Sequence, residues 1–197
     1  MSGYTSESYV LREGWREASL LNCPIHGGLE CGFSRHGSYG RVRPAGIRVA
    51  RCRCPTARVT FSLLPDFLAS RLSGTLDEVE QVVCTTEAAR SVEAAADVLR
   101  PDIELPGAVR WVRRRLSPVR TALLVISTLL PGLLPVTGDL RAVRSHLGSE
   151  HALMELRGMA EKYLGEIRWP VGLSPPKAGG VPRGGPRQHE VGADPGT

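Results

Sequence analysis

The feature that most constrains the fold is a cluster of metal-ligand residue types in the first third of the chain. Four of the five cysteines and two of the five histidines lie between residues 22 and 54. The first residues, MSGYTSESYVLREG, lack the basic start and apolar run of a signal peptide, so we do not expect exported, disulfide-bonded cysteines. The clustered cysteines are therefore better explained as metal ligands.

The spacing of these residues fits a small metal-binding module. Cys23 and His26 are separated by two residues, the gap that lets both ligands of a zinc knuckle point at one ion. Residues 40–54, GRVRPAGIRVARCRC, predict a β-hairpin with a Pro-Ala-Gly turn. Cys52 and Cys54 would share one face of its second strand, because side chains alternate between the two faces of a strand.

Three helices are signalled in the middle of the chain. Thr75 and Glu78 have the form of a capping box, and Ser91 is a candidate N-cap for the next helix. Pro101 ends that second helix, and Pro106 suits the first turn of a third. Short helices in this succession are typical of a helix-turn-helix.

The third helix is rich in arginine. Val109, Val112 and Leu116 recur at helical spacing and predict its buried face. The arginines on or near its outer side are Arg110, Arg113, Arg114 and Arg115. In helix-turn-helix proteins the last helix enters the major groove, where guanidinium groups contact guanine edges or phosphates. A solvated basic face on a structural helix would leave the same pattern, so both interpretations stay open.

Several motifs along this stretch resemble a known family. The most specific are RHGSY at 35–39 and TFSLLP at 60–65, followed by IELPGAVRWVRRR at 103–115. Together with the cysteines, they resemble the zinc-ribbon domain of bacterial transposase-associated proteins over residues 22–130. In that family the ribbon lies ahead of a helix-turn-helix segment, in insertion-sequence transposases or in stand-alone relatives.

The resemblance implies a structural zinc ion, with a changed set of ligands. The family pattern is Cys-x2-Cys twice, whereas this chain has His26 in the first pair and Ala57 where the last cysteine would stand. The expected zinc ligands are Cys23, His26, Cys54 and either Cys31 or Cys52. The alternative is a decayed ribbon whose thiols pack as small apolar groups.

These patterns predict an α+β fold that is mainly α, with a small β-hairpin zinc-ribbon-like module followed by a helix-turn-helix and extra helices. The expected divisions are a polar leader at 1–20, the zinc-ribbon-like module at 21–70, the helix-turn-helix and a following apolar helix at 75–132, a helical extension at 133–168, and a disordered Pro/Gly-rich tail at 169–197.

Catalysis and membrane insertion are not expected. The chain has no Walker loop, nucleophile elbow, Rossmann glycine motif or HExxH, and no separate domain that would hold the carboxylates of a transposase. The apolar stretch 122–136 is shorter than the ~20 residues of a spanning helix and is interrupted by two prolines. We therefore expect a cytoplasmic protein that is not an enzyme and has no small-molecule substrate.

The resulting hypothesis is a protein that binds double-stranded DNA, related to the DNA-binding part of insertion-sequence transposases. The formal net charge of +5 agrees with such a partner. The arginines expected to contact DNA are Arg41, Arg43, Arg48, Arg51 and Arg53 on the hairpin, and Arg110, Arg113, Arg114 and Arg115 on the third helix.

Three other functions remain open. One is an interaction adaptor that uses the apolar stretch 123–134, including as a homodimer. Another is a transposon remnant without DNA binding. The third is RNA binding, because zinc ribbons also grip single strands.

Overall fold

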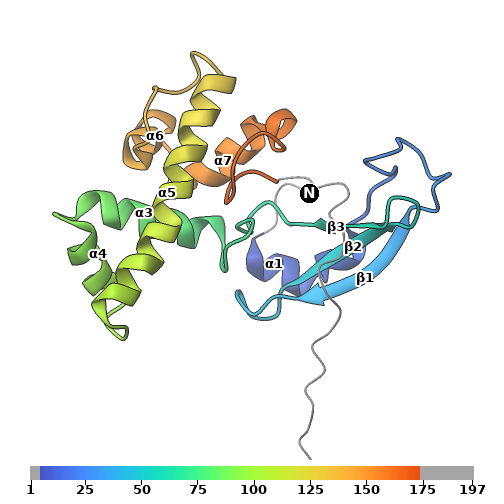
Figure 1. The fold of residues 1–197 in the computed structure, drawn as a ribbon, viewed down its shortest axis with the longest axis horizontal. Coiled ribbons are helices and arrows are strands. Elements are labelled where there is room, and N and C mark those ends of the chain that lie inside the picture. Colours follow the sequence, from blue (N-terminus) through green and yellow to red (C-terminus); the bar gives the residue numbers. More distant parts are fainter. Residues whose placement is uncertain (1–4, 174–197) are drawn as a thin grey trace, which may run out of the picture.

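The computed structural model describes residues 5–173 and has an α+β fold that is mostly helical. Figure 1 shows a sheet-bearing half and a helical half joined by the segment between β3 and α3. The described elements are α1 (Ser6–Leu11), α2 (Gly14–Glu17), β1 (Ser34–Gly40), β2 (Arg48–Cys54), β3 (Val59–Leu63), α3 (Leu76–Ala88), α4 (Val92–Leu99), α5 (Leu105–Leu129), α6 (Leu140–Leu147), α7 (Ala152–Met159) and the short 3-10 helix η1 (Glu161–Tyr163).

The sheet has three antiparallel strands in the order β1-β2-β3. The expected turn lies between β1 and β2, where Gly46 has the left-handed φ of 79° that glycine tolerates best. The first strand, however, ends at Gly40, where the predicted hairpin was expected to begin. Arg41 and Arg43 therefore lie in the connecting loop. The strand at 34–40 escaped prediction because SRHGSYG contains no alternation of apolar and polar residues.

The segment 1–20 was expected to be a polar leader. Its described part instead contains two helices, α1 and α2. Tyr9 is fully buried against the sheet, and its hydroxyl donates to the carbonyl of Arg48. From β1, the guanidinium of Arg35 donates to backbone carbonyls at the end of α2, including those of Arg16 and Ala18. One aromatic anchor and one arginine thus dock these short helices on the sheet.

The helical half is built around α5, a single helix of 25 residues. Within 75–132, the third helix of the expected helix-turn-helix and the apolar helix expected to follow it are therefore one continuous helix. Pro118 is buried inside this helix. Its first half packs on α4 through Val109 and Val112. Its second half, including Leu123 and Ile126, enters the main core with α3, α6 and α7. The apolar face predicted from helical spacing is buried as expected.

The predicted helix starts are confirmed. The Thr75 hydroxyl accepts from the N–H of Glu78, whose carboxylate accepts in return from the N–H of Thr75. The Ser91 hydroxyl accepts from the N–H of Ala94 at the start of α4. Such caps satisfy amide groups that have no partner within the helix.

Two glutamates of α3 cap two other helices. The carboxylate of Glu80, 2% exposed, accepts from the N–H groups of Ala152 and Leu153 at the start of α7. Seven residues later, Glu87 accepts from the N–H groups of Leu140 and Arg141 at the start of α6. One face of α3 therefore holds the first turns of both later helices, where negative charge is also favoured by the helix dipole.

The start of the disordered tail was predicted at residue 169, and this boundary is wrong, because residues 169–173 belong to the folded part. Val171 is fully buried in the main core. The guanidinium of Arg157 on α7 donates to the carbonyls of Pro170 and Val171, and also to those of Asp66 and Leu68 in the segment between β3 and α3. The rest of the expected tail, 174–197, lies outside the described residues.

We expect Glu80→Ala to lower the free energy of unfolding by about 2–4 kcal/mol, because two buried N–H groups of α7 lose their charged acceptor. Urea unfolding followed by circular dichroism measures this change. The matched control is Asp97→Ala, which removes an exposed carboxylate on α4 and should change stability by less than about 0.5 kcal/mol. Equal losses in the two variants would contradict the capping role.

Candidate metal centre and basic surfaces

The metal-ligand residues meet where the loop after α2 passes the turn between β2 and β3 (Figure 1). Around Cys23 the backbone forms a tight knuckle, in which the Gly27 N–H donates to the Cys23 carbonyl at 2.8 Å and the Cys23 N–H donates to the Gly28 carbonyl at 3.1 Å. Cys54 ends β2, directly before the turn that leads to β3. Two chain reversals therefore present their side chains to the same point.

The structure brings together a group of three cysteines and one histidine that could hold a metal ion. The ligand atoms of Cys23, His26, Cys31 and Cys54 all lie within 4.8 Å of one another. The Nδ1 atom of His26 is 3.4 Å from the Cys23 sulfur and 3.5 Å from the Cys54 sulfur. A tetrahedral ion with ordinary metal–sulfur and metal–nitrogen bonds needs a separation of about 3.6 Å. The donor set and its spacing fit such an ion.

Cys31, and not Cys52, supplies the fourth ligand atom of this group. Cys52 is buried next to it among Phe33, Cys54 and Phe61. Two residues along a strand span about 6.6 Å, which exceeds the sulfur–sulfur edge of about 3.8 Å in a tetrahedral site. Neighbouring thiols on one strand face therefore reach one ion poorly, whereas the glycine-containing loop brings Cys31 across.

Ala57 occupies the position at which the family pattern has its last cysteine. Its backbone N–H donates to the Cys54 sulfur at 3.4 Å. The methyl side chain packs against the small apolar cluster that contains Cys52 and Cys54. Cys31, rather than residue 57, thus completes the group of four residues that could hold a metal ion.

The electrostatics of the site favour loss of one proton before any metal binds. Burial raises the pKa of the Cys23 thiol, but hydrogen bonds with the His26 side chain and the backbone of His26 and Ile25 outweigh it and lower that pKa to about 6. For Cys31, burial and hydrogen bonds with Cys23 and Cys54 raise the pKa. A metal ligand must be a thiolate, so Cys23 is the first thiol prepared for that role.

The arginines predicted on the hairpin differ in their surroundings. Arg43 and Arg53 are exposed. The Arg48 guanidinium donates to the hydroxyl and carbonyl of Ser38, and Arg51 lies over the Tyr39 ring at 4.3 Å. Arg41 donates at 2.6 Å to the Leu72 carbonyl and so ties the hairpin loop to the segment before α3. Arg41 is therefore engaged within the protein rather than free for a phosphate.

The arginines of α5 differ in the same way. Arg110, Arg113 and Arg114 are exposed, as expected, and Arg113 forms an ion pair with Glu93 at 3.4 Å. Arg115 departs from the expectation because it is only 8% exposed. It stands one turn after Trp111, so its guanidinium stacks on that indole at 3.8 Å and donates to the Trp111 carbonyl.

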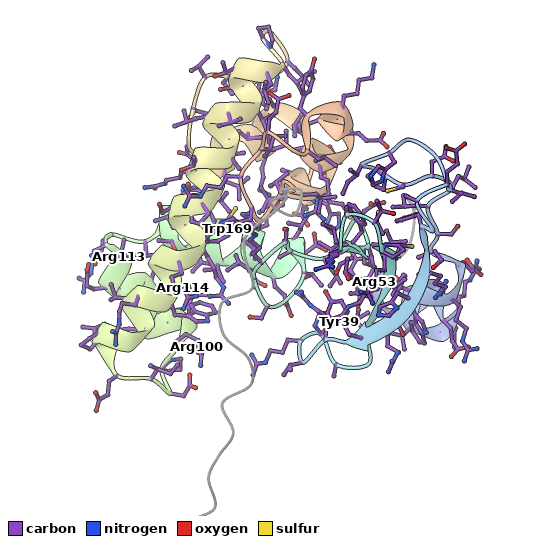
Figure 2. The ribbon with its side chains drawn as sticks, turned by 45° about the vertical axis from the view of Figure 1, so that its right-hand side comes forward. Tyr39, Arg53, Arg100, Arg113, Arg114 and Trp169 are labelled. Carbon is purple, nitrogen blue, oxygen red and sulfur yellow. The ribbon has the colours of Figure 1, made fainter. Side chains whose placement is uncertain are left out.

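The basic residues lie on two separate parts of the molecule. Figure 2 shows Arg113, Arg114 and Arg100 at one end of the helical half, and Arg53 with Tyr39 on the sheet. Sequence reasoning missed Arg71 and Arg100, which lie near the α5 arginines, because each is a single arginine in a segment without periodicity. Their proximity to α5 arises only from the packing of the chain.

Much of the apolar stretch 122–136 packs in the core, because Leu123, Ile126 and Leu134 are buried. Leu124, in contrast, is about half exposed. Across residues 5–173, no helix combines the length and hydropathy needed to cross a bilayer.

Comparisons with known proteins gave no match, whether to a family model, a curated protein or a solved structure.

We expect Cys31→Ser to retain less than about half of the zinc that the unaltered chain retains after dialysis, because the tetrahedral group loses one thiolate. Cys52→Ser is the matched control, as it removes a buried thiol of the same module and should leave zinc retention unchanged. Zinc per chain is measured by atomic emission. Loss of zinc in the control with full retention in Cys31→Ser would show that the ligands are assigned wrongly.

Proposed function

We propose that this protein binds double-stranded DNA through exposed arginines and that a structural zinc ion stabilises its sheet-bearing half. The observation that carries the proposal is the set of three exposed arginines, Arg110, Arg113 and Arg114, on the first half of α5. Three guanidinium groups within five residues of one helix provide a local positive potential that suits a polyanion.

Zinc is the metal that this donor set favours. Three thiolates and one imidazole are soft and borderline ligands, which suit zinc much better than magnesium or calcium. Four protein ligands fill a tetrahedral shell and leave no open position for a substrate or water. The proposed role of the ion is therefore to hold the loop of Cys23 and Cys31 against the strand end at Cys54.

The proposed DNA-binding surface has a helix part and a sheet part. The α5 arginines supply the first part, and exposed Arg43 and Arg53 supply the second. Most contacts of this kind are to phosphates, which position a protein on the duplex without reading its sequence. Base-edge contacts by Arg110 or Arg114 in the major groove would add specificity.

The sequence motifs at 35–39, 60–65 and 103–115 resemble the DNA-binding part of insertion-sequence transposases, and this resemblance supports the proposal. The complete four-ligand group weighs against a decayed remnant, because Cys31 compensates for Ala57. The use of Leu123 and Ile126 by the core weighs against an adaptor that docks through this stretch. DNA binding is therefore the function that the arrangement supports best.

Fluorescence anisotropy of a labelled random-sequence duplex across a salt series tests the proposal. We expect affinity to fall steeply with salt, and Arg53→Gln or Arg114→Gln to reduce the slope of log affinity against log salt by about one unit each. Arg141→Gln is the matched control, since it removes an exposed arginine on α6, away from both basic parts, and should leave the slope unchanged.

The same titration with a zinc chelator tests the metal. We expect chelation to weaken duplex binding, because the sheet arginines lose their scaffold. Absence of duplex binding at low salt would refute the DNA-binding proposal. Duplex binding that does not change on chelation would refute the proposed role of the metal in it.

A further inference from the structure

A basic cleft lies between the first half of α5 and the segment that precedes α3. Its volume is about 430 Å³, within the range of roughly 300–1,000 Å³ that is usual for small-molecule sites. The charged and polar residues that line it are Arg71, Ser73, Arg110, Arg114 and Arg115, and Trp111 forms an aromatic wall. Four guanidinium groups from two separate segments therefore surround one hollow.

The positive charge in this cleft is largely uncompensated. Within residues 5–173, none of Arg71, Arg110, Arg114 and Arg115 forms an ion pair with a carboxylate. The nearby carboxylates have other partners, because Asp102 pairs with Arg100 and Glu78 caps the backbone of Thr75. An anion in the cleft would supply the missing negative charge.

The most deeply placed of these groups is Arg115. Its side chain is stacked on Trp111, and it reaches the Ser73 hydroxyl at 3.5 Å. Burial, followed by the neighbouring charges of Arg100 and Arg114, lowers the pKa of Arg115 to about 10. The group is therefore still charged at neutral pH, in surroundings that disfavour its charge.

The backbone at Arg71 is unusual in a way that concerns the cleft. Its φ of 58° lies in the left-handed region, which costs energy for a residue with a side chain. Arg71 is exposed and lines the cleft opposite α5. The unfavourable backbone conformation of Arg71 thus accompanies a fourth guanidinium group at the cleft, beside those of the three α5 arginines.

We propose that this cleft binds a phosphate group, held by Arg71, Arg110 and Arg114 at its surface and by Arg115 and Ser73 at its base. Guanidinium groups suit this ligand because their paired N–H donors match two oxygens of one phosphate. The inference deepens the proposed function, and it rests on that function where the phosphate belongs to DNA. The phosphate of a nucleic-acid backbone and that of a free phosphate compound share this chemistry.

Isothermal titration calorimetry of the full chain with inorganic pyrophosphate tests the cleft. We expect Arg114→Gln and Arg71→Gln to weaken binding at least about tenfold, since each removes a charge-assisted donor pair. Arg120→Gln is the matched control, because Arg120 is another exposed arginine of α5, pairs with Glu87 and does not line the cleft. It should stay within about twofold of the unaltered chain. Far-ultraviolet circular dichroism verifies that each variant is folded.

Two results would overturn the proposal. One is the absence of pyrophosphate binding, and the other is an equal loss in Arg120→Gln and Arg114→Gln. A parallel titration with a thymidine tetranucleotide identifies the source of the phosphate. Binding at least about tenfold tighter than that of pyrophosphate assigns the cleft to a nucleic-acid strand, whereas weaker or equal binding assigns it to a free phosphate compound.

The duplex titration separates this inference from the proposed function. If the unaltered chain binds duplex DNA but pyrophosphate binding is absent, or does not depend on Arg71 and Arg114, DNA binding stands and the cleft is refuted. If pyrophosphate binds with the expected dependence on Arg71 and Arg114 but duplex does not bind, the cleft stands and duplex DNA binding is refuted.

Discussion

The rest of the structure depends on one buried guanidinium, that of Arg157. It donates to four backbone carbonyls that belong to two segments far apart in the chain, and so joins α7 to the segment after β3 and to the segment at 170–171. Burial lowers the pKa of Arg157 to about 10, which still leaves it charged at neutral pH. The carbonyl of Pro170 also accepts from the N–H of Ser70, and a buried carbonyl that loses its donor costs free energy, so Arg157 satisfies acceptors that are expensive to leave unpaired. The sheet-bearing and helical halves therefore keep their relative placement through a side chain that sequence patterns do not identify.

Local signals predicted the parts of the fold that depend on local physics. The caps at Thr75 and Ser91 depend on residues three positions apart, and their hydrogen bonds form as expected. The spacing of Cys23 and His26 likewise indicated one half of the candidate metal centre. The choice between Cys31 and Cys52 could not be made from sequence, because it depends on how a loop crosses the end of a strand.

The features that escaped prediction all involve contacts between distant segments. Tyr9 is an ordinary aromatic residue in a polar stretch until the sheet buries it. Residues 169–173 read as the start of a Pro/Gly-rich tail, yet Arg157 and the main core hold them. Arg115 belongs to an arginine cluster by sequence, whereas Trp111 and Ser73 give it a different environment from that of its neighbours. Composition records how many arginines a chain has, and only the fold distributes them between surface and interior.

The two capping glutamates of α3 bear on how the helical half assembles. The helices that they cap, α6 and α7, have eight residues each, a length at which an isolated helix is unstable in water. The N-cap residue of α7 makes no side-chain capping hydrogen bond. The first turn of α6 is capped by two carboxylates, those of Asp139 and Glu87. Docking onto α3 and formation of these helices are therefore coupled events, so the C-terminal helices should acquire their hydrogen bonds together with their tertiary contacts rather than before them. This half of the protein is then expected to unfold as one cooperative unit, with α3 as its template.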